Sequence, residues 1–140
     1  FMFSYNLLGQ LGTGDTQDRL TPTNVMDDIK YVSCGRDHTG VITTDNKLYM
    51  FGDNGWYQLG TGNTQDKSIP IFVMNDIKYV SCGDWHTGVI TTDNKLFMFG
   101  NNGSGQLGTG DTIWRSKPTN IMNDVRNISC GGNYTGVIGN

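Results

Sequence analysis

The stretch Tyr31-Val-Ser-Cys-Gly35 recurs as Tyr79-Val-Ser-Cys-Gly83 and again as Asn127-Ile-Ser-Cys-Gly131, each copy 48 residues after the last. Gln10-Leu-Gly-Thr-Gly14 recurs twice at the same step, with nothing inserted or deleted between copies. A period of this length is typical of solenoids, propellers and other repeat arrays, in which each copy is one supersecondary unit. We therefore expect shared residues to serve the fold, whereas residues that differ between copies are free for function.

The composition favours strands and turns. The chain has no Ala and no Glu, so all 13 acidic residues are Asp, and it has 20 Gly. Good helix formers are therefore scarce, whereas Gly, Asn and Asp favour turns and the β-branched and aromatic residues favour strands. We predict an all-β fold.

The net charge of −3 and the absence of Lys/Arg runs exclude an electrostatic footprint for direct binding of nucleic acid or an anionic membrane. Cys34, Cys82 and Cys130 share one repeat position, and equivalent atoms of adjacent repeats should lie beyond the roughly 7 Å that a disulfide allows. We expect small buried thiols and an intracellular compartment, cytoplasm or nucleus, with a virion as the alternative.

One copy divides into four predicted strands. They are residues 29–34, 39–44, 47–51 and 71–74, with a two-residue hairpin turn at Asp45-Asn46 and Pro70 just before the last strand. The third strand is apolar on both faces and must be covered on both sides. Four antiparallel strands of this kind predict a propeller blade. The hairpin turn argues against the main rival, a solenoid of parallel strands. Central leucines of the Gly-rich loops should anchor those loops between blades: Leu11, Leu59 and Leu107.

Two further stretches carry a family resemblance. Val32-Ser-Cys-Gly-Arg-Asp-His-Thr-Gly-Val-Ile42 and Val80-Ser-Cys-Gly-Asp-Trp-His-Thr-Gly-Val-Ile90 resemble the signature of the regulator of chromosome condensation repeat family. The resemblance spans the whole chain and implies a propeller that closes as a seven-bladed ring. The chain departs from the family where a larger apolar residue is usual, at Gly40, Gly88 and Gly136.

We read residues 1–140 as part of one propeller domain, with repeats at 1–48, 49–96 and 97–140. The register starts in the third strand of one blade and stops in the second strand of another, about three blades' worth with an open edge at each end. We expect further repeats of the native chain, or another chain, to complete the ring.

No motif predicts catalysis, a metal or a cofactor. His38 and His86 follow a Cys by four residues, but Tyr134 replaces them in the third copy and no other metal ligands recur, so a structural ring that bonds its turn is favoured. Gly103-Ser-Gly-Gln-Leu-Gly108 matches a dinucleotide fingerprint but has no helix after it.

All three tryptophans lie where sister copies carry something smaller or polar. Trp56 corresponds to Leu8 and Ser104, Trp85 to Asp37 and Asn133, and Trp114 to Asp18 and Asp66. Two interpretations stay open: an exposed anchor for a partner, or a ring packed locally over its own loop. The predicted partner-binding residues are Arg36, Asp37, Trp56, Tyr57, Asp84, Trp85, Trp114 and Arg115.

Three functions follow. The first is a non-catalytic scaffold that binds a protein partner. The second, implied by the resemblance alone, is guanine-nucleotide exchange on a small Ran-type GTPase, although the unbroken spacing leaves no room in these repeats for the wedge used by such factors. The third is a structural component of a viral or other large assembly, suggested by the open edges and near-identical copies.

Overall fold

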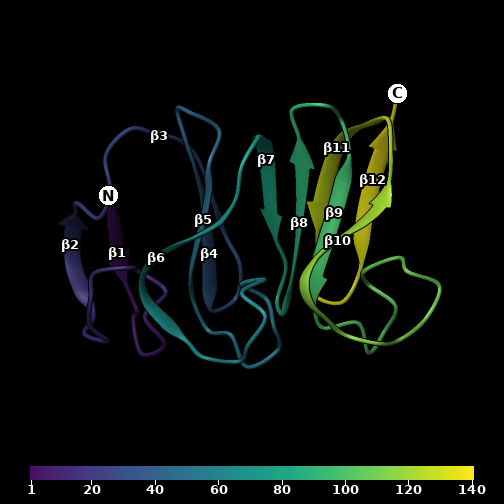
Figure 1. Cartoon of the computed structure of the whole chain (residues 1–140). Coiled ribbons are helices and arrows are strands. Elements are labelled where there is room, and N and C mark those ends of the chain that lie inside the picture. The colour runs from purple at the N-terminus through teal and green to yellow at the C-terminus, as the bar shows by residue number, and fades with distance from the viewer.

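The computed structural model describes all of residues 1–140 and contains twelve strands and no helix (Figure 1). The strands are β1 (Met2–Ser4), β2 (Arg19–Thr23), β3 (Ile29–Cys34), β4 (His38–Thr43), β5 (Leu48–Gly52), β6 (Lys67–Met74), β7 (Ile77–Cys82), β8 (His86–Thr91), β9 (Leu96–Gly100), β10 (Arg115–Met122), β11 (Val125–Cys130) and β12 (Thr135–Gly139). They form two four-stranded antiparallel sheets, β3–β6 and β7–β10, and a two-stranded sheet at each end of the chain. The all-β class and the four-stranded blade are confirmed.

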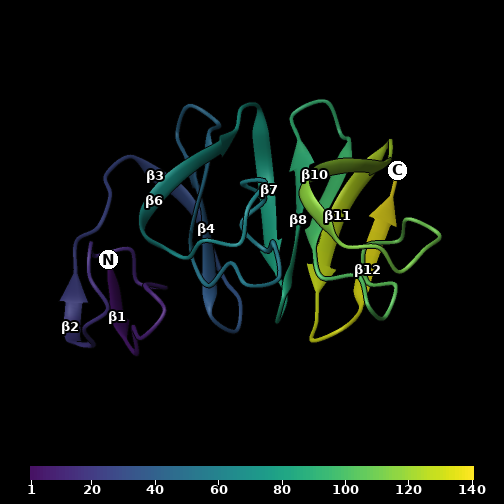
Figure 2. The same cartoon turned by 60° about the horizontal axis from the view of Figure 1, so that its bottom comes forward.

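The sheets stand side by side, with β1–β2 at one end of the row and β11–β12 at the other (Figures 1 and 2). The first strands of successive sheets adjoin, so β7 packs against both β3 and β11. These are three blades' worth of a ring, as predicted. Strand β1 pairs only with β2, and β12 only with β11. Closure of the ring by further repeats or by another chain stays a prediction.

Burial follows the position of each strand within a blade. Every residue of β4 and β8 is buried, and β5 and β9 are buried at all positions but one. The outermost strands β6 and β10 are only partly covered. The middle strands are therefore covered on both faces, which explains their continuous apolar sequence.

Two predicted details are wrong. The connection between β4 and β5 spans residues 44–47 and not two residues, and only Asn46 within it has a positive φ, 67°. A longer connection closed from Asn46 N–H to the Thr43 carbonyl needs one left-handed residue and not two. In addition, β6 begins at Lys67, so Pro70 lies inside the strand. The ladder shifts register there, and β6 is an edge strand, so the missing N–H removes no essential bond.

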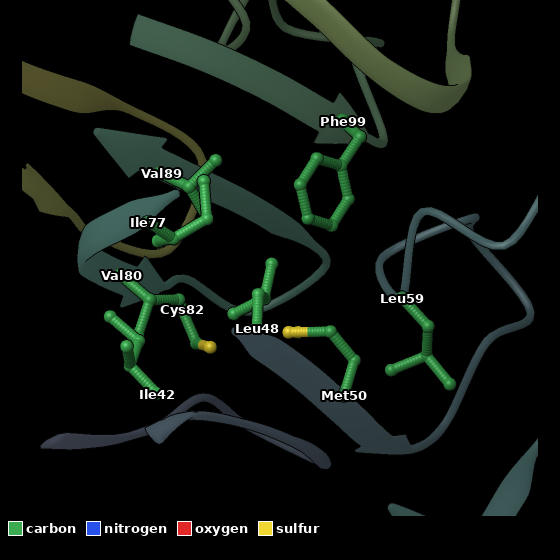
Figure 3. Packing of buried hydrophobic residues seen from close by; sticks show 9 residues of the cluster. All are labelled: Ile42, Leu48, Met50, Leu59, Ile77, Val80, Cys82, Val89 and Phe99. Atoms are coloured by element: carbon green, nitrogen blue, oxygen red, sulfur yellow. The ribbon is translucent and has the colours of Figure 1, made fainter. Parts of the chain in front are cut away.

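The core lies between blades. One cluster joins Ile42, Leu48 and Met50 of the first complete blade to residues of the next, including Val80 and Phe99 (Figure 3). Leu59 belongs to this cluster although it comes from a loop, and it is fully buried. The equivalent Leu11 and Leu107 are also buried. The prediction that these leucines anchor the Gly-rich loops between blades is confirmed for Leu59 and Leu107, which belong to interblade clusters, and Leu11 is buried as expected.

The departure from the family at Gly88 has a steric reason. A Cβ on Gly88 would lie 2.2 Å from Ile128 Cδ1 of the next blade and 2.7 Å from Met98 Sδ. A Cβ on Gly40 would likewise lie 2.9 Å from Met50 Sδ and 2.9 Å from Val80 Cγ2. The long Met and branched side chains therefore fill the space that a larger residue on the second strand would take.

A hydrogen-bond relay ties each Gly-rich loop to the next blade. The Thr87 hydroxyl donates to the Gln58 carbonyl at 2.7 Å, and His38 Nε2 lies 2.9 Å from the same hydroxyl oxygen. Because the Thr87 proton is used, His38 Nε2–H is the donor. Its Nδ1 has no hydrogen-bond partner and burial lowers the pKa of the ring, so the ring is neutral. The pattern recurs at His86, whose Nε2 lies 3.0 Å from Thr135 Oγ1. The histidines therefore bond the neighbouring blade and not their own turn.

A buried asparagine holds each loop in shape. Asn54 Nδ2 donates to Thr61 Oγ1 and to two loop carbonyls, and its Oδ1 accepts the Leu59 N–H at 3.1 Å. Asn6 and Asn102 make the same set of bonds in the other copies. The loop that carries Leu59 into the core is therefore a fixed structure.

We predict that Gly88→Ala lowers the free energy of unfolding by about 1–3 kcal/mol, because the added Cβ overpacks the blade interface. Gly136→Ala is the matched control, since the nearest atom to its Cβ would be Ser129 O at 3.9 Å. Urea denaturation measures both. Equal stability of the two variants would contradict the steric account.

We also predict acid sensitivity from the buried histidines. Burial lowers the pKa of His38 to about 3 and that of His86 to about 4, from 6.5. The unfolded chain therefore takes up these protons first, and stability falls as the pH drops from about 6.5 towards those values, by as much as about 5 kcal/mol for His38. Urea midpoints at about pH 7 and about pH 4 test this. The His38→Gln, His86→Gln double variant should show a smaller difference, and an unchanged difference would refute the assignment.

Candidate protein-binding site

All eight residues predicted to bind a partner lie on one face of the molecule. They lie on or next to connections at one end of the sheets, opposite the short hairpins at residues 44–47 and 92–95 (Figure 1). These connections are the long ones between the third and fourth strands of a blade, residues 53–66 and 101–114, and the short ones between the first and second strands, residues 35–37 and 83–85. Antiparallel pairing requires this arrangement, because the first and third strands of a blade end where the second and fourth begin.

The structure brings the three tryptophans into one cluster. The ring centroids of Trp56 and Trp114 are 4.9 Å apart, and those of Trp56 and Trp85 are 5.8 Å apart. Tyr57 meets Trp114 edge-on at 6.3 Å. These four residues, here called the tryptophan cluster, extend from the inner loop before β8 to the start of the outermost strand β10. Trp56 reaches the other two rings because its loop lies against the next blade.

The rings of the tryptophan cluster are only partly covered. Trp56 is 36% exposed and Trp114 is 39% exposed, while Trp85 and Tyr57 are intermediate. The sequence identified the positions but not their contact, because each Trp comes from a different copy of the loops. Each ring packs chiefly against another ring, an arrangement that neither interpretation had included.

Charged groups flank the tryptophan cluster. The Arg36 guanidinium lies 5.0 Å from the centroid of Trp85, within cation–π range, and 3.6 Å from the Asp37 carboxylate. At the other end Arg115 pairs with Asp111 at 2.8 Å, and this hydrogen bond is the main cause that lowers the pKa of Asp111 to about 2. Asp84, next to Trp85, takes part in no ion pair.

Two residues of the tryptophan cluster stand where the other copies carry a residue that stabilises the equivalent loop. Asp18 and Asp66 each accept the backbone N–H of the loop asparagine at 2.8 Å, and Trp114 stands at the equivalent position in the third copy. Tyr57 has φ +62°, where Gly9 and Gly105 stand in the sister copies. A left-handed non-glycine residue is disfavoured by about 1–3 kcal/mol. The loops that carry these two aromatic side chains therefore lose some stability.

The inner strands bring the cysteines around a shallow hollow at this face. Cys34, Cys82 and Cys130 line it with neighbouring glycines and with Arg36 and Asp84. All three thiols are free, and burial raises their pKa, to about 12 for Cys82. Cys82 is buried as predicted, whereas Cys34 is exposed, because β3 lacks the neighbour that β7 has on each side. No three His, Cys or Asp side chains are grouped to hold a metal ion.

With no helix in the structure, no helical segment is available to cross a membrane. Pairing of the strands accounts for all regular structure, and the face described above is built from loops and from Arg115, the first residue of β10.

Solved structures share this fold. Human WBSCR16 superposes with a TM-score of 0.80 over 95% of this chain and 38% of its own, at 24% identity. Prp20p from Saccharomyces cerevisiae superposes with a TM-score of 0.79 over 98% of this chain and 39% of its own, at 20% identity. At these identities the likeness shows the fold alone.

Curated relatives match shorter stretches. The X-linked retinitis pigmentosa GTPase regulator of Mus musculus is 45% identical over 51 residues, which are 33% of this chain and 5% of that protein. The probable E3 ubiquitin-protein ligase HERC3 of Homo sapiens is 38% identical over 56 residues, 37% of this chain and 5% of that protein. The ultraviolet-B receptor UVR8 of Arabidopsis thaliana is 43% identical over 51 residues, 34% of this chain and 12% of that protein.

The chain thus spans only a small part of these relatives. The repeat itself is recognised along almost the whole chain, with three matches at residues 5–42, 45–90 and 93–138. A second description of the repeat matches residues 29–58 and 77–106. The chain belongs to the regulator of chromosome condensation (RCC1) repeat family.

Proposed function

We propose that this chain is a non-catalytic scaffold that binds a protein partner through the tryptophan cluster. The observation that carries the proposal is the coincidence of three departures from the repeat at one place. Trp56, Trp85 and Trp114 differ from their sister residues, come from different loops, and meet on one surface. Partly exposed Trp and Tyr with adjacent Arg are the residue types that dominate binding energy at interfaces.

The local loss of stability caused by Tyr57 and Trp114 supports the same proposal. A residue in a disfavoured conformation persists where function requires it, and Tyr57 keeps a left-handed backbone that a glycine would take without strain. Trp114 likewise replaces a carboxylate that caps the loop in the other copies. Neither aromatic residue is needed to form the loop, because the sister loops fold without one.

The sister copies supply variants that remove the aromatic surface with no new strain. Trp56→Ser and Tyr57→Gly copy Ser104-Gly105, Trp85→Asn copies Asn133, and Trp114→Asp copies Asp66. Trp114→Asp also supplies a carboxylate for the backbone N–H of Asn102, as Asp66 does for Asn54, and this hydrogen bond offsets part of the lost ring packing. This separates loss of binding from loss of folding.

We predict that the four-residue variant recovers its partner far less from cell extract. Loss of one central Trp anchor costs about 2 kcal/mol or more, a fall in affinity of about 30-fold. Affinity capture with quantitative mass spectrometry measures the recovery, and thermal melting verifies folding. The matched control is Ile69→Ala, Phe72→Ala, which removes exposed apolar side chains from the outer strand β6. Recovery of the same proteins by all three forms would sink the proposal.

Guanine-nucleotide exchange is the alternative function. It is favoured by relatives whose names describe GTPase regulation, such as Ras guanine nucleotide exchange factor C of Dictyostelium discoideum, 34% identical over 58 residues. The three copies described above carry no insertion between blades that could act as a wedge. Release of labelled GDP from Ran-type and Ras-type GTPases distinguishes exchange from scaffolding, which predicts no acceleration.

A further inference from the structure

We propose that the partner of the tryptophan cluster presents an arginine-containing basic segment. This inference rests on the proposed function and adds the chemistry of the partner. It is carried by the charges around the cluster and by the arrangement of its rings. Both features can be seen in the contacts of the face that carries the long loops, here called the loop face.

Both cations at the site already have carboxylate partners. Arg36 lies 3.6 Å from Asp37, and Arg115 lies 2.8 Å from Asp111. An acidic partner would have to displace these internal carboxylates.

Two carboxylates at the site form no ion pair, although Arg36 lines the same hollow as one of them, Asp84. Asp84 precedes Trp85 and makes no ion pair. Asp53 belongs to the turn that carries Trp56, and it accepts hydrogen bonds from Gly55 N–H at 3.0 Å and Gln58 Nε2 at 2.8 Å, both uncharged donors. The residual charge beside the tryptophan cluster is therefore negative. A positively charged segment complements it, and carboxylates of this kind steer such a segment towards the rings.

The rings select the type of cation. Their centroids are 4.9 to 6.3 Å apart, so neighbouring rings touch and leave no space for a compact ammonium group between them. An aromatic cage for a quaternary ammonium group is thus excluded. A planar guanidinium can instead stack on an outer ring face, as Arg36 does on Trp85 at 5.0 Å. Trp56 and Trp114 offer the partner equivalent partly exposed rings.

The opposite face of the molecule shows the contrast. Its hairpin carboxylates Asp45 and Asp93 are paired with Lys47 and Lys95 at 2.8 and 2.9 Å. These hairpins carry no tryptophan. Asp76 and Asp124 at that end also form no ion pair, so the loop face is distinguished by the combination of unpaired carboxylates with stacked indoles.

The test uses three fluorescein-labelled peptides of equal length, built from Arg-Gly, Lys-Gly or Glu-Gly repeats, and measures their binding to the purified protein by anisotropy. We expect the Arg peptide to bind several-fold more tightly than the Lys peptide, and the Glu peptide to bind most weakly. Trp56→Ser should weaken the Arg peptide about fivefold. Asp84→Asn should weaken it about two- to fivefold, and increasingly at low salt. Asp93→Asn on the opposite face is the matched control and should change nothing.

Several results would overturn the inference. One is a Glu peptide that binds as tightly as the Arg peptide, and another is an equal effect of Asp84→Asn and Asp93→Asn. A third is Arg-peptide binding that Trp56→Ser leaves unchanged. If the Glu peptide bound and lost affinity on Trp56→Ser, the basic partner would be refuted while the tryptophan cluster remained a binding surface. The proposed function fails separately, through unchanged recovery in the capture experiment.

Discussion

The packing of each blade against the next is the constraint on which the rest of the structure depends. A single four-stranded sheet whose middle strands are apolar on both faces cannot cover those faces with its own strands, so it needs a neighbouring sheet on each side. The Gly-rich loop makes that neighbour specific. It carries Leu59 into the interblade core, where Gly60 takes φ +71° and its Cα faces the Phe99 ring. It also presents the Gln58 carbonyl to the Thr87 hydroxyl of the next blade.

The same loops create the functional surface. Once the loop before β6 is fixed on the next blade, its tip lies beside the loops of that blade, and side chains from separate repeats become neighbours. Trp56 thereby meets Trp85 and Trp114, which lie in the following copy. The scaffold needs none of these three side chains, because equivalent loops fold with Leu, Ser, Asp or Asn in their place. The residues shared by the repeats therefore fix where the loops lie, and the residues that differ between copies provide the binding side chains.

Much of the fold could be predicted from the sequence because periodicity and burial are linked. The strands, the blade and the buried leucines Leu11, Leu59 and Leu107 follow from alternation and from the repeat. The hairpin at Asn46 and the strand around Pro70 could not be bounded, since turn length and bulges depend on ladder register, which local composition does not determine. The site residues were identified one by one, as positions that vary between copies or, for Arg115, as the neighbour of a varying Trp. Their contact was not, because it depends on how far a loop extends over the next blade and how its side chains point.

The most direct test of this account is a double-mutant cycle between His38 and Thr87, which are 49 positions apart in the chain and 2.9 Å apart across the blade interface. Unfolding free energies of His38→Ala, Thr87→Val and the double variant give the coupling energy. Stacked blades predict a coupling of about 0.5–3 kcal/mol, because the two residues share one buried hydrogen-bond relay. Strictly additive effects would show that the two residues do not meet, and would contradict the packing from which both the fold and the tryptophan cluster are derived.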